Sequence, residues 1–513
     1  MIDWLEGEAT AYTPQWAKVI DQTRCIGCHA CTTACKSENE VPLGVSRTYV
    51  KYVDVGTFPQ ARRAFQVTRC NQCVDAPCTT ACPTTAMYTR PDGIVDFNKD
   101  SCIGCRACMA ACPYDAIFIN PRDHFAEKCN FCAHRLDVGL EPACVIVCPT
   151  EAILVGDLRD PTSKVAQVVN RDVVSVRRPE KATRPKLFYK GAHQATLDPI
   201  AARRPEGGIF MWSEQADGSL HAISGNSHDA NSSATAVLSY DVSHEIPWDW
   251  RVSLYTWTKS IAAGAYMVLA FLLVFGLMSP EALLWRVVTP VLAGVFLAAT
   301  GGLLIWDLEH PERFLYIFTR AQWKSWLVRG AFLITGYSLV LLVHFLAGLS
   351  NLASLTEILI VPGLPLAILT AAYTAFLFAQ ARARDLWQNP LLPPHIGLIQ
   401  ATLAGSAAVL PFAAWLDSGL VADLLWILAG SALLHLLLLV SEATLGHPTS
   451  HAHLAAQEML RGRYARFFWV GAVLMLGAIA APLIGLVAVP LALVGLLAYE
   501  HAYVQSGQSV PLA

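Results

Sequence analysis

The stretch Cys25-Ile-Gly-Cys28-His-Ala-Cys31-Thr-Thr-Ala-Cys35 decides how the N-terminal part of this chain folds. Its cysteines follow the spacing C-x2-C-x2-C-x3-C, and related spacings return three times before residue 150. All sixteen cysteines of the 513-residue chain belong to these four groups of four. The later groups are Cys70-x2-Cys73-x4-Cys78-x3-Cys82, Cys102-x2-Cys105-x2-Cys108-x3-Cys112 and Cys129-x2-Cys132-x11-Cys144-x3-Cys148, each followed by a proline.

This spacing suits cubane iron–sulfur clusters, which need four soft thiolates each. A C-x2-C-x2-C loop supplies three thiolates to one cluster, and the fourth cysteine reaches the other cluster of a pair. The proline that follows prevents the chain from continuing as the same helix. Four groups therefore predict four [4Fe–4S] clusters in two loop-rich, ferredoxin-like units, whose folding is coupled to cluster binding.

Three other uses of the cysteines fit the sequence poorly. Disulfides need an oxidising compartment, and the first 25 residues contain neither an apolar segment nor a twin arginine. Cys25-Ile-Gly-Cys28-His29 matches the attachment pattern of c-type haem, but Cys31 and Cys35 stand where a cluster needs them. Four successive ferredoxin-type groups, three of which end in Cys-Pro, argue against zinc sites. We therefore expect neither disulfides, haem c nor zinc.

The composition indicates that one part of the chain lies in water and another lies in the lipid bilayer. Hydrophobic residues make up 54% of the chain, and the long apolar runs all lie after Lys259. The net charge is only −3 and no basic stripe occurs, so we expect no nucleic-acid partner. We predict a four-cluster domain at 1–160, a linker and docking segment at 161–250, and a membrane anchor at 251–513.

Finer features inside the first two segments can also be predicted. The apolar stretches 93–97 and 116–119 indicate brief strands. The stretch 213–239 is rich in Ser, Ala, Asn, Asp and Gly, which is typical of a mobile loop.

The membrane part contains about eight stretches long enough to cross a bilayer, which takes about 20 apolar residues. The last two come from one uncharged run that we divide at Pro482 and Pro490. Gly301-Gly302 and Gly405-Ser-Ala-Ala408 indicate close helix packing. The predicted spans are roughly 254–278, 283–306, 326–348, 355–379, 395–416, 420–441, 465–483 and 486–504. The predicted fold is thus an α+β ferredoxin-like tandem followed by an all-α membrane bundle.

The charges between the spans predict an orientation. The connections after the second, fourth and sixth spans carry nine arginines and lysines, whereas the other connections carry only Arg286. Positive connections stay in the cytoplasm. The N-terminus shares their side, so we expect the cluster domain on the cytoplasmic side of the inner membrane.

Residues 20–200 resemble the iron–sulfur subunits of the dimethyl-sulfoxide and polysulfide reductase type. In that family the first cysteine group pairs with the fourth, and the second pairs with the third. The resemblance implies four ligand sets: Cys25, Cys28, Cys31 and Cys148; Cys35, Cys129, Cys132 and Cys144; Cys70, Cys73, Cys78 and Cys112; and Cys82, Cys102, Cys105 and Cys108.

The membrane part resembles the polysulfide reductase membrane subunits, also called NrfD-like anchors. Three segments carry this resemblance: Asp307-Leu-Glu-His-Pro-Glu-Arg-Phe314, Ser325-Trp-Leu-Val-Arg-Gly330 and Gly507-Gln508. The resemblance implies a site for quinone or quinol, the absence of haem, and a separate large catalytic subunit with a molybdenum or tungsten pterin.

A quinone site needs a dry pocket, a group that exchanges protons, and donors for the carbonyl oxygens. Ionisable residues inside a membrane are functional candidates by default. Each candidate also has a purely structural interpretation, such as an ion-paired helix end or a hydrogen-bonded histidine. The candidates are Asp307, Glu309, His310, Arg313, His435, Lys259 and Tyr255; Glu500 and His501 are interpreted as interfacial.

Together these observations predict an oxidoreductase subunit that passes electrons between a separate catalytic subunit and membrane quinone. One alternative is a redox-coupled proton-translocating module, which would use Glu357, Asp423 and His344. Another is a plain anchor whose electrons leave to a soluble carrier.

Overall fold

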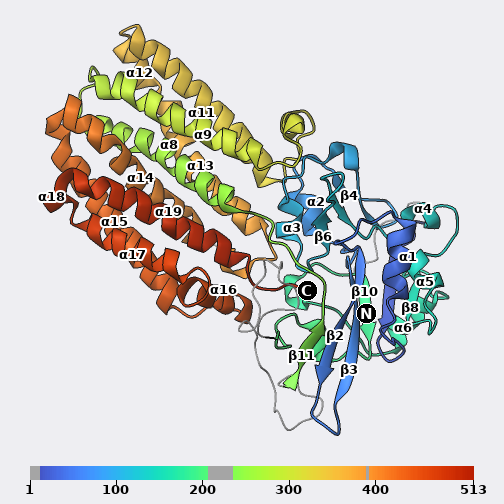
Figure 1. Ribbon diagram of the computed structural model, residues 1–513. Helices are drawn as coiled ribbons and strands as arrows, with labels where there is room; N and C mark the ends of the chain where they lie inside the picture. Colours follow the sequence, from blue (N-terminus) through green and yellow to red (C-terminus); the bar gives the residue numbers. More distant parts are fainter. Residues whose placement is uncertain (1–11, 206–234, 389–391) are drawn as a thin grey trace. The chain divides into compact units, whose positions relative to one another are not determined.

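The computed structural model describes residues 12–205, 235–388 and 392–513. The chain forms two compact units, Met1–Pro247 with Ser509–Ala513 and Trp248–Gln508. Figure 1 shows short strands and helices joined by loops in the first unit, which we call the cluster unit, and long helices in the second, the membrane unit. The predicted fold class, a loop-rich α+β part followed by an all-α bundle, is therefore confirmed.

Two small sheets and two hairpins organise the cluster unit. In the first sheet β1 pairs antiparallel with β8 and parallel with β10. Its order is β8 (Ile153–Asp157), β1 (Trp16–Asp21), β10 (Leu187–Lys190) and β9 (Val174–Ser175). The second sheet has the order β11 (Val237–Tyr240), β2 (Thr48–Val55) and β3 (Arg62–Arg69). The hairpins are β4 (Met87–Thr89) with β5 (Val95–Phe97), and β6 (Ile117–Ile119) with β7 (Ala126–Lys128). Both predicted brief strands are thus present, as β5 and β6.

The cysteine groups share a local conformation that follows from their spacing. A short helix begins one residue before the third cysteine of each group. His29 and Arg106, which precede two of these helices, have φ of 59° and 57°, so the loop turns back through the left-handed region. These helices are α1 (Ala30–Glu38), α2 (Pro77–Ala81), α3 (Ala107–Ala111) and α5 (Ala143–Ile146).

The predicted linker needs correction over much of its length, because it builds part of the cluster unit. Strand β10 lies inside the first sheet, and β11 adds to the second. A four-residue strand is too short to show in the sequence, and it forms here because β1 offers it an edge. The segment also contains α6 (Lys164–Arg171), η3 (Pro179–Lys181) and α7 (Gln194–Leu197). Most of the predicted loop at 213–239 lies outside the described residues. The remaining elements of the unit are α4 (Ala133–Leu136) and η2 (Lys99–Ser101).

Among the described residues of the membrane unit, seven helices are long and apolar enough to cross a bilayer. They cover Trp250–Val274, Leu284–Trp306, Trp326–Leu349, Ile360–Gln380, His395–Leu416, Ser418–Thr444 and Ala481–Gly507. The predicted span at 465–483 corresponds to a shorter apolar helix, Ala465–Ile479. The prediction of about eight spans therefore agrees with seven long helices and one short one.

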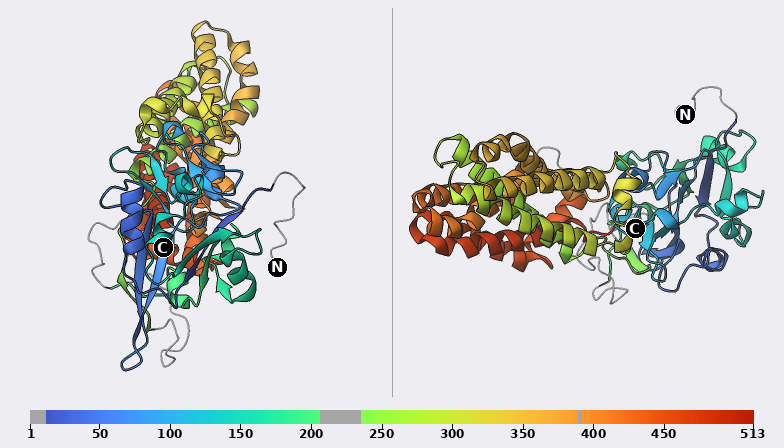
Figure 2. Two further views of the ribbon diagram at one scale, coloured as in Figure 1. Left: turned by 90° about the vertical axis from the view of Figure 1, so that its right-hand side faces the viewer. Right: turned by 90° about the horizontal axis from the view of Figure 1, so that it is seen from above.

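These helices run side by side in Figure 2. The main ones are α8 (Trp250–Val274), α9 (Thr289–Trp306), α11 (Trp326–Leu349), α13 (Ile360–Gln380), α14 (Leu392–Leu416), α15 (Val421–Thr444), α17 (Ala465–Ile479) and α19 (Ala488–Gly507). The connecting elements are η5 (Leu284–Val288), η6 (Pro311–Arg313), α10 (Tyr316–Thr319), α12 (Ala353–Ile358), η7 (Asp385–Trp387), η8 (Ser418–Leu420), α16 (Ser450–Leu460), α18 (Ala481–Ile484) and η9 (Gly485–Val487).

Helix α8 lies at the centre of the bundle and packs against α9, α13, α14 and α19. Its contact with α14 is close because two glycines face each other. A Cβ added to Gly264 would lie 1.7 Å from the carbonyl oxygen of Ala401, and one added to Gly405 would lie 2.0 Å from the backbone of Gly264. The prediction from Gly405 is therefore confirmed. The prediction from Gly301-Gly302 is wrong, because a Cβ built at either glycine meets no atom of a neighbouring described element within 4 Å.

Candidate functional site

Cysteines of the first and fourth groups lie together in the cluster unit. Cys31 and Cys144 share one buried cluster of side chains, against which Cys25 and Cys148 pack. Asn39 links the same two groups, because its Nδ2 lies 3.7 Å from Cys35 Sγ and 3.8 Å from Cys132 Sγ. Packing of α1 against α5 produces this juxtaposition.

Cysteines of the second and third groups also meet. A pocket of about 360 Å³, counting the space at its mouth, is lined by Cys82 from the second group and by three cysteines of the third, Cys102, Cys105 and Cys108. Packing of α2 against α3 brings the groups together. The four thiols around this pocket are the same set that the family resemblance implies for one cluster.

The cysteine thiols lie close together, and the mutual repulsion of their thiolates favours the binding of positively charged iron. Burial, followed by the thiolates of Cys129, Cys144 and Cys132, raises the pKa of Cys35. Burial, Cys70, Cys112 and Cys73 raise the pKa of Cys78 in the same way, although Lys128 opposes the shift. Such a set of thiolates needs positive charge among them, which cluster iron supplies. Among the described residues no three His, Cys, Asp or Glu side chains converge on a point as the ligands of a single ion would.

Backbone N–H groups also point at the sulfur atoms. Met87 donates to Cys82 Sγ at 3.4 Å, Ala126 to Cys102 Sγ at 3.4 Å, and Ala152 to Cys148 Sγ at 3.2 Å. Hydrogen bonds to the sulfur atoms are one of the features that set a cluster's reduction potential. The donor set and its surroundings therefore fit iron–sulfur clusters.

Cys144 has the most positive surroundings of these thiols. Arg69, whose side chain is fully buried, donates from Nη1 to Cys144 Sγ at 3.0 Å, and Lys18 Nζ lies 3.7 Å away. Burial raises the pKa of Cys144, but the charges of Arg69 and Lys18 outweigh it and lower the pKa to about 7. The same charges stabilise a more negative, reduced cluster.

We expect Arg69→Gln to lower the reduction potential of the cluster bound through Cys144. A hydrogen bond to a charged group contributes about 1.5–3 kcal/mol, which corresponds to roughly 60–130 mV for one electron. A redox titration followed by electron paramagnetic resonance (EPR) measures the shift. Arg63→Gln is the matched control, because Arg63 forms an exposed ion pair with Asp54 at 2.7 Å. An unchanged potential in Arg69→Gln would contradict this role.

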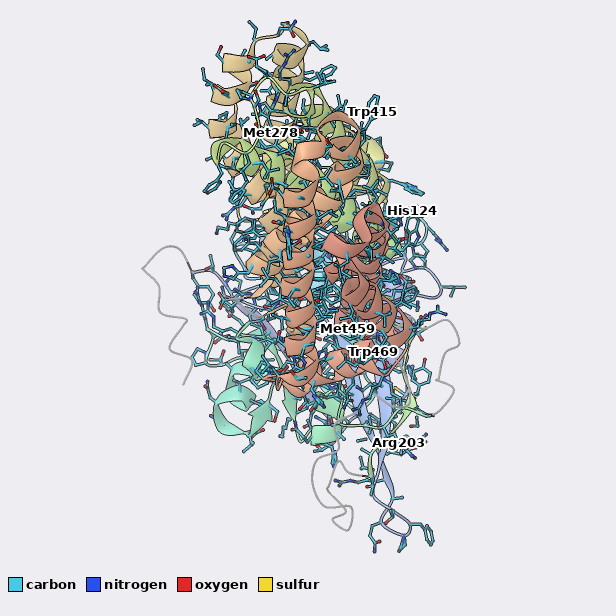
Figure 3. All side chains as sticks on the ribbon, turned by 90° about the vertical axis from the view of Figure 1, so that its left-hand side faces the viewer. His124, Arg203, Met278, Trp415, Met459 and Trp469 are labelled. Atoms are coloured by element: carbon cyan, nitrogen blue, oxygen red, sulfur yellow. The ribbon has the colours of Figure 1, made fainter. Side chains whose placement is uncertain are left out.

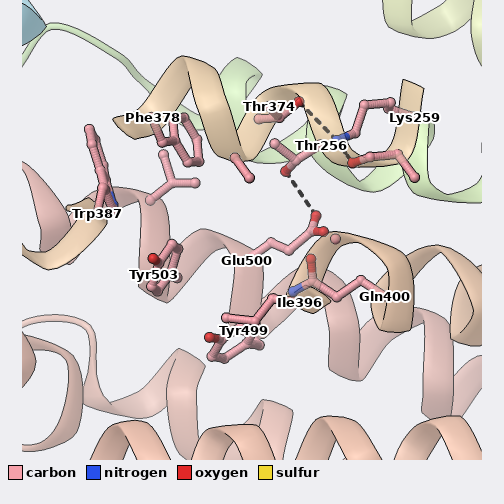
Figure 4. Close-up of a pocket in the computed structure, with 14 residues that line it drawn as sticks. Thr256, Lys259, Thr374, Phe378, Trp387, Ile396, Gln400, Tyr499, Glu500 and Tyr503 are labelled. Atoms are coloured by element: carbon pink, nitrogen blue, oxygen red, sulfur yellow. Dashed lines mark hydrogen bonds between the residues drawn. The ribbon is translucent and has the colours of Figure 1, made fainter. Parts of the chain in front are cut away.

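The membrane unit contains a pocket that encloses about 550 Å³, counting the space at its mouth. Its lining residues belong to α8, α13, η7, α14 and α19, and Figure 4 labels ten of them. It is lined by Thr256, Lys259, Ala371, Thr374, Ala375, Phe378, Trp387, Ile396, Gly397, Gln400, Tyr499, Glu500, Tyr503 and Val504.

Two ionisable side chains face this pocket from different helices. Lys259 Nζ donates to the carbonyl oxygen of Ala371 at 2.9 Å and to Thr374 Oγ1 at 2.8 Å. Glu500 Oε2 accepts a hydrogen bond from Thr256 Oγ1 at 2.9 Å. An ammonium group has three N–H donors and a carboxylate has two oxygens. One donor and one acceptor therefore remain for a molecule bound between them.

Aromatic rings form another part of the wall. Phe378 stacks on Trp387 at 4.7 Å between ring centroids, and Trp248 lies against both rings, 5.7 Å from Trp387 and 5.8 Å from Phe378. Tyr499 and Tyr503 stack at 5.9 Å on α19. Flat apolar surfaces with a few convergent polar groups suit a planar organic molecule.

The predicted quinone-site residues separate into three sets. Lys259 lines the pocket. Tyr255 is buried one turn earlier on α8, and His435 is buried with its ring 4.8 Å from that of Tyr499, so these two lie close to the pocket without lining it. The structure does not bring the third set, Asp307, Glu309, His310 and Arg313, to the pocket lining.

The Asp307–Phe314 segment forms ion pairs of its own. Arg251 Nε lies 3.4 Å from Asp307 Oδ1, His310 Nδ1 lies 3.0 Å from Glu312 Oε1, and Arg313 lies 3.7 Å from the same oxygen. These contacts agree with the structural interpretation of the segment as an ion-paired corner at the end of α9.

Sequence reasoning missed several pocket residues, above all Glu500. Glu500, interpreted from the sequence as interfacial, is only 4% exposed and faces this pocket. One signal could have revealed it, since Glu500 is the only Asp, Glu, Lys or Arg between residues 488 and 507. A lone carboxylate in an apolar span is a functional candidate by default. Gln400 and the aromatic wall carry no comparable signal.

Comparisons with known families match both units. A 4Fe-4S binding domain matches residues 16–37, and a 4Fe-4S dicluster domain matches residues 62–158. The family described as polysulphide reductase, NrfD, matches residues 239–495, which is half of the chain.

Individual relatives match the cluster unit. The B subunit of the tetrathionate reductase of Salmonella typhimurium is 42% identical over 197 residues, which cover 37% of this chain and 77% of the relative. The B subunit of the polysulfide reductase of Wolinella succinogenes is 43% identical over 177 residues, which cover 34% of this chain and 93% of the relative. The arsenate respiratory reductase iron–sulfur subunit of a Shewanella species is 36% identical over 219 residues, which cover 33% of this chain and 94% of the relative. The chain therefore belongs to the NrfD polysulphide reductase family, and it fuses that family's multi-pass membrane bundle to an iron–sulfur electron-transfer part similar to the B subunits of reductases.

Proposed function

We propose that this chain carries electrons through four [4Fe–4S] clusters between a separate catalytic subunit and quinone, which binds in the pocket lined by Lys259 and Glu500. The observation that carries the proposal is this pair of ionisable groups on separate helices of an apolar bundle. A quinone has two carbonyl oxygens on opposite edges of a flat ring. Lys259 can donate to one edge, Glu500 can exchange a proton at the other, and the stacked aromatic side chains can contact the ring.

The four clusters are proposed to be held by the cross-paired cysteine sets. The shared packing of the first and fourth groups, and the pocket lined by Cys82 and the third group, support this assignment. When bound, the clusters supply one-electron steps. The protein insulates them, hydrogen-bonds their sulfur atoms and places positive charge beside one of them.

A catalytic partner is proposed to dock where the cluster unit exposes apolar side chains beside cysteines. Ile26 lies between Cys25 and the exposed Cys28, and Ile146 and Val147 precede Cys148. These three side chains are 57%, 56% and 39% exposed. Exposed apolar side chains next to a redox group favour a protein interface there. The relatives' names, which call them subunits of reductases, and the family resemblance support a molybdenum- or tungsten-pterin subunit as the partner.

The cluster unit is proposed to face the cytoplasm, because an even number of spans separates it from each positively charged connection. Treating inverted membrane vesicles and intact spheroplasts with protease tests this orientation. We expect the cluster unit to be cut in the inverted vesicles and protected in the spheroplasts, and the opposite pattern would place it on the other side.

The function itself is tested by an EPR-monitored redox titration of the purified membrane complex, with and without a quinone-site inhibitor. We expect four [4Fe–4S] signals, one of them shifted by the inhibitor, and reoxidation of the reduced clusters by added quinone. Reduced clusters that quinone does not reoxidise would refute the quinone link and favour a plain anchor.

A further inference from the structure

The proposed pocket raises the question of how protons reach it. A quinone exchanges two protons for every two electrons, and the carboxylate at the pocket, Glu500, is 4% exposed. Little of the Glu500 side chain is therefore open to direct exchange with bulk water. A path of protonatable side chains would connect the pocket with an aqueous phase.

Behind one wall of the pocket lies a histidine without hydrogen bonds. His435 on α15 is 0% exposed, and in the part of the chain that the structure describes neither Nδ1 nor Nε2 has a hydrogen-bond partner. A buried polar atom without a partner is costly. His435 therefore indicates a site for water or for a transferred proton.

Two tyrosines stand between this histidine and the pocket. Tyr499 lines the pocket, and its ring contacts His435 edge-on at 4.8 Å. Tyr503, one turn further along α19, also lines the pocket and stacks on Tyr499. Both hydroxyl groups can donate and accept hydrogen bonds.

A carboxylate continues the series toward the end of the bundle. Glu442 lies seven residues after His435 on α15 and therefore on the same helix face. It is partly exposed and interacts electrostatically with both Tyr499 and Tyr503. Helix α15 ends two residues later, and α16 follows at this end of the bundle. Figure 3 shows Met459 of α16 and Trp469 at this end, with Trp415 and Met278 at the other.

We propose that Glu442 takes up and releases the quinone's protons at the α16 end of the bundle, and that His435, Tyr499 and Tyr503 relay them between Glu442 and the pocket. This inference rests on the proposed function of the pocket. For quinol oxidation, each quinol loses two electrons to the clusters and two protons, which leave through Glu500 and then the relay. Quinone reduction uses the same groups in reverse, so charge and atoms balance in both directions.

Other titratable groups surround the outer part of this path. His447 follows α15 and interacts with the backbone of Glu442, and its ring lies 6.4 Å from that of His453 on α16. Arg466 of α17 lies near His501 of α19. His451 and Glu458 are buried on α16, and Tyr464 is buried just before α17. The pH dependence of the path is thus set by Glu442 together with these neighbours.

The test compares Glu442→Gln with the unaltered complex in quinone-dependent reoxidation of the clusters between about pH 6 and 9, a range wide enough to follow a proton-transfer group. We expect the rate to fall about 100-fold, the lower end of the usual contribution of a proton-transfer group, and its pH profile to change, while the inhibitor still shifts the cluster's EPR signal. A small weak acid such as formate should restore part of the rate, because it carries protons past the missing carboxylate. His435→Phe keeps the ring but removes both nitrogens, and it should also slow the reaction.

The matched control is Glu281→Gln, because Glu281 pairs with Arg286 at 3.5 Å in the connection between α8 and α9, at the opposite end of the bundle. Its rate and pH profile should match those of the unaltered complex. A Glu442→Gln complex with unaltered rate and pH profile would overturn the path and leave the quinone pocket intact. The proposed path would also be overturned if the inhibitor no longer shifted the cluster's EPR signal in Glu442→Gln. Failure of the unaltered complex to react with quinone would instead refute the proposed function.

Discussion

Cys148→Ser removes the cluster of the first cysteine group, although Cys148 lies far along the chain from Cys35, the last cysteine of that group. The reason is that Cys148 packs in the same buried cluster as Cys25 and Cys31. Serine is a much poorer ligand than a thiolate for a soft metal centre. We expect one of four [4Fe–4S] EPR signals to disappear or to change to that of an incomplete cluster, and electron flow to quinone to fall below detection.

The matched variant is Cys35→Ser, in which the mutated cysteine belongs to the first group and the affected cluster to the fourth. Besides burial, the nearby thiolates of Cys129, Cys144 and Cys132 raise the pKa of Cys35. Loss of Cys35 should therefore damage the cluster of the fourth group. The two variants must therefore remove different signals, each in the group that does not contain the mutated cysteine. Loss of the cluster of the mutated cysteine's own group in either variant would refute the cross-pairing.

Glu500→Gln is expected to slow quinone-dependent reoxidation of the clusters by about 10²–10⁴-fold, the usual contribution of a positioned proton-transfer group. The amide keeps the side chain's shape and can still accept the hydrogen bond from Thr256 Oγ1. The bundle should therefore fold, and all cluster signals should remain. Stopped-flow absorbance of the reduced clusters after mixing with a soluble quinone measures the rate.

Glu312→Gln is the matched control for this variant. Glu312 lies in the Asp307–Phe314 segment, and its side chain is 63% exposed. Its rate should equal that of the unaltered complex if the pocket, and not this segment, binds quinone. The opposite pattern, with a slow Glu312→Gln and a fast Glu500→Gln, would place the quinone chemistry in the segment that the family resemblance emphasised.

Lys259 and Glu500 illustrate why the pocket could be only half predicted. Lys259 attracts notice because it is a charge at the start of an apolar span. Glu500 lies near the end of the last predicted span, a position that also suits a side chain at the membrane interface. Only the packing of α19 against α8 turns it inward, toward the same cavity. The stacked Phe378 and Trp387 give no signal for a similar reason, since aromatic residues are ordinary in any span.

The residue pattern alone predicts the cysteine chemistry and the change from a cysteine-rich to an apolar part of the chain. Ligand spacing and apolar length act over a few residues to about twenty, so they can be read without knowing the fold. Three further features become visible only in the folded chain: which cysteine groups lie together, that β10 and β11 complete the sheets of the cluster unit, and that Lys259 and Glu500 line one pocket with His435 close behind its wall. These features depend on which face each helix or strand turns toward its neighbours, and that choice is made by packing of the whole chain.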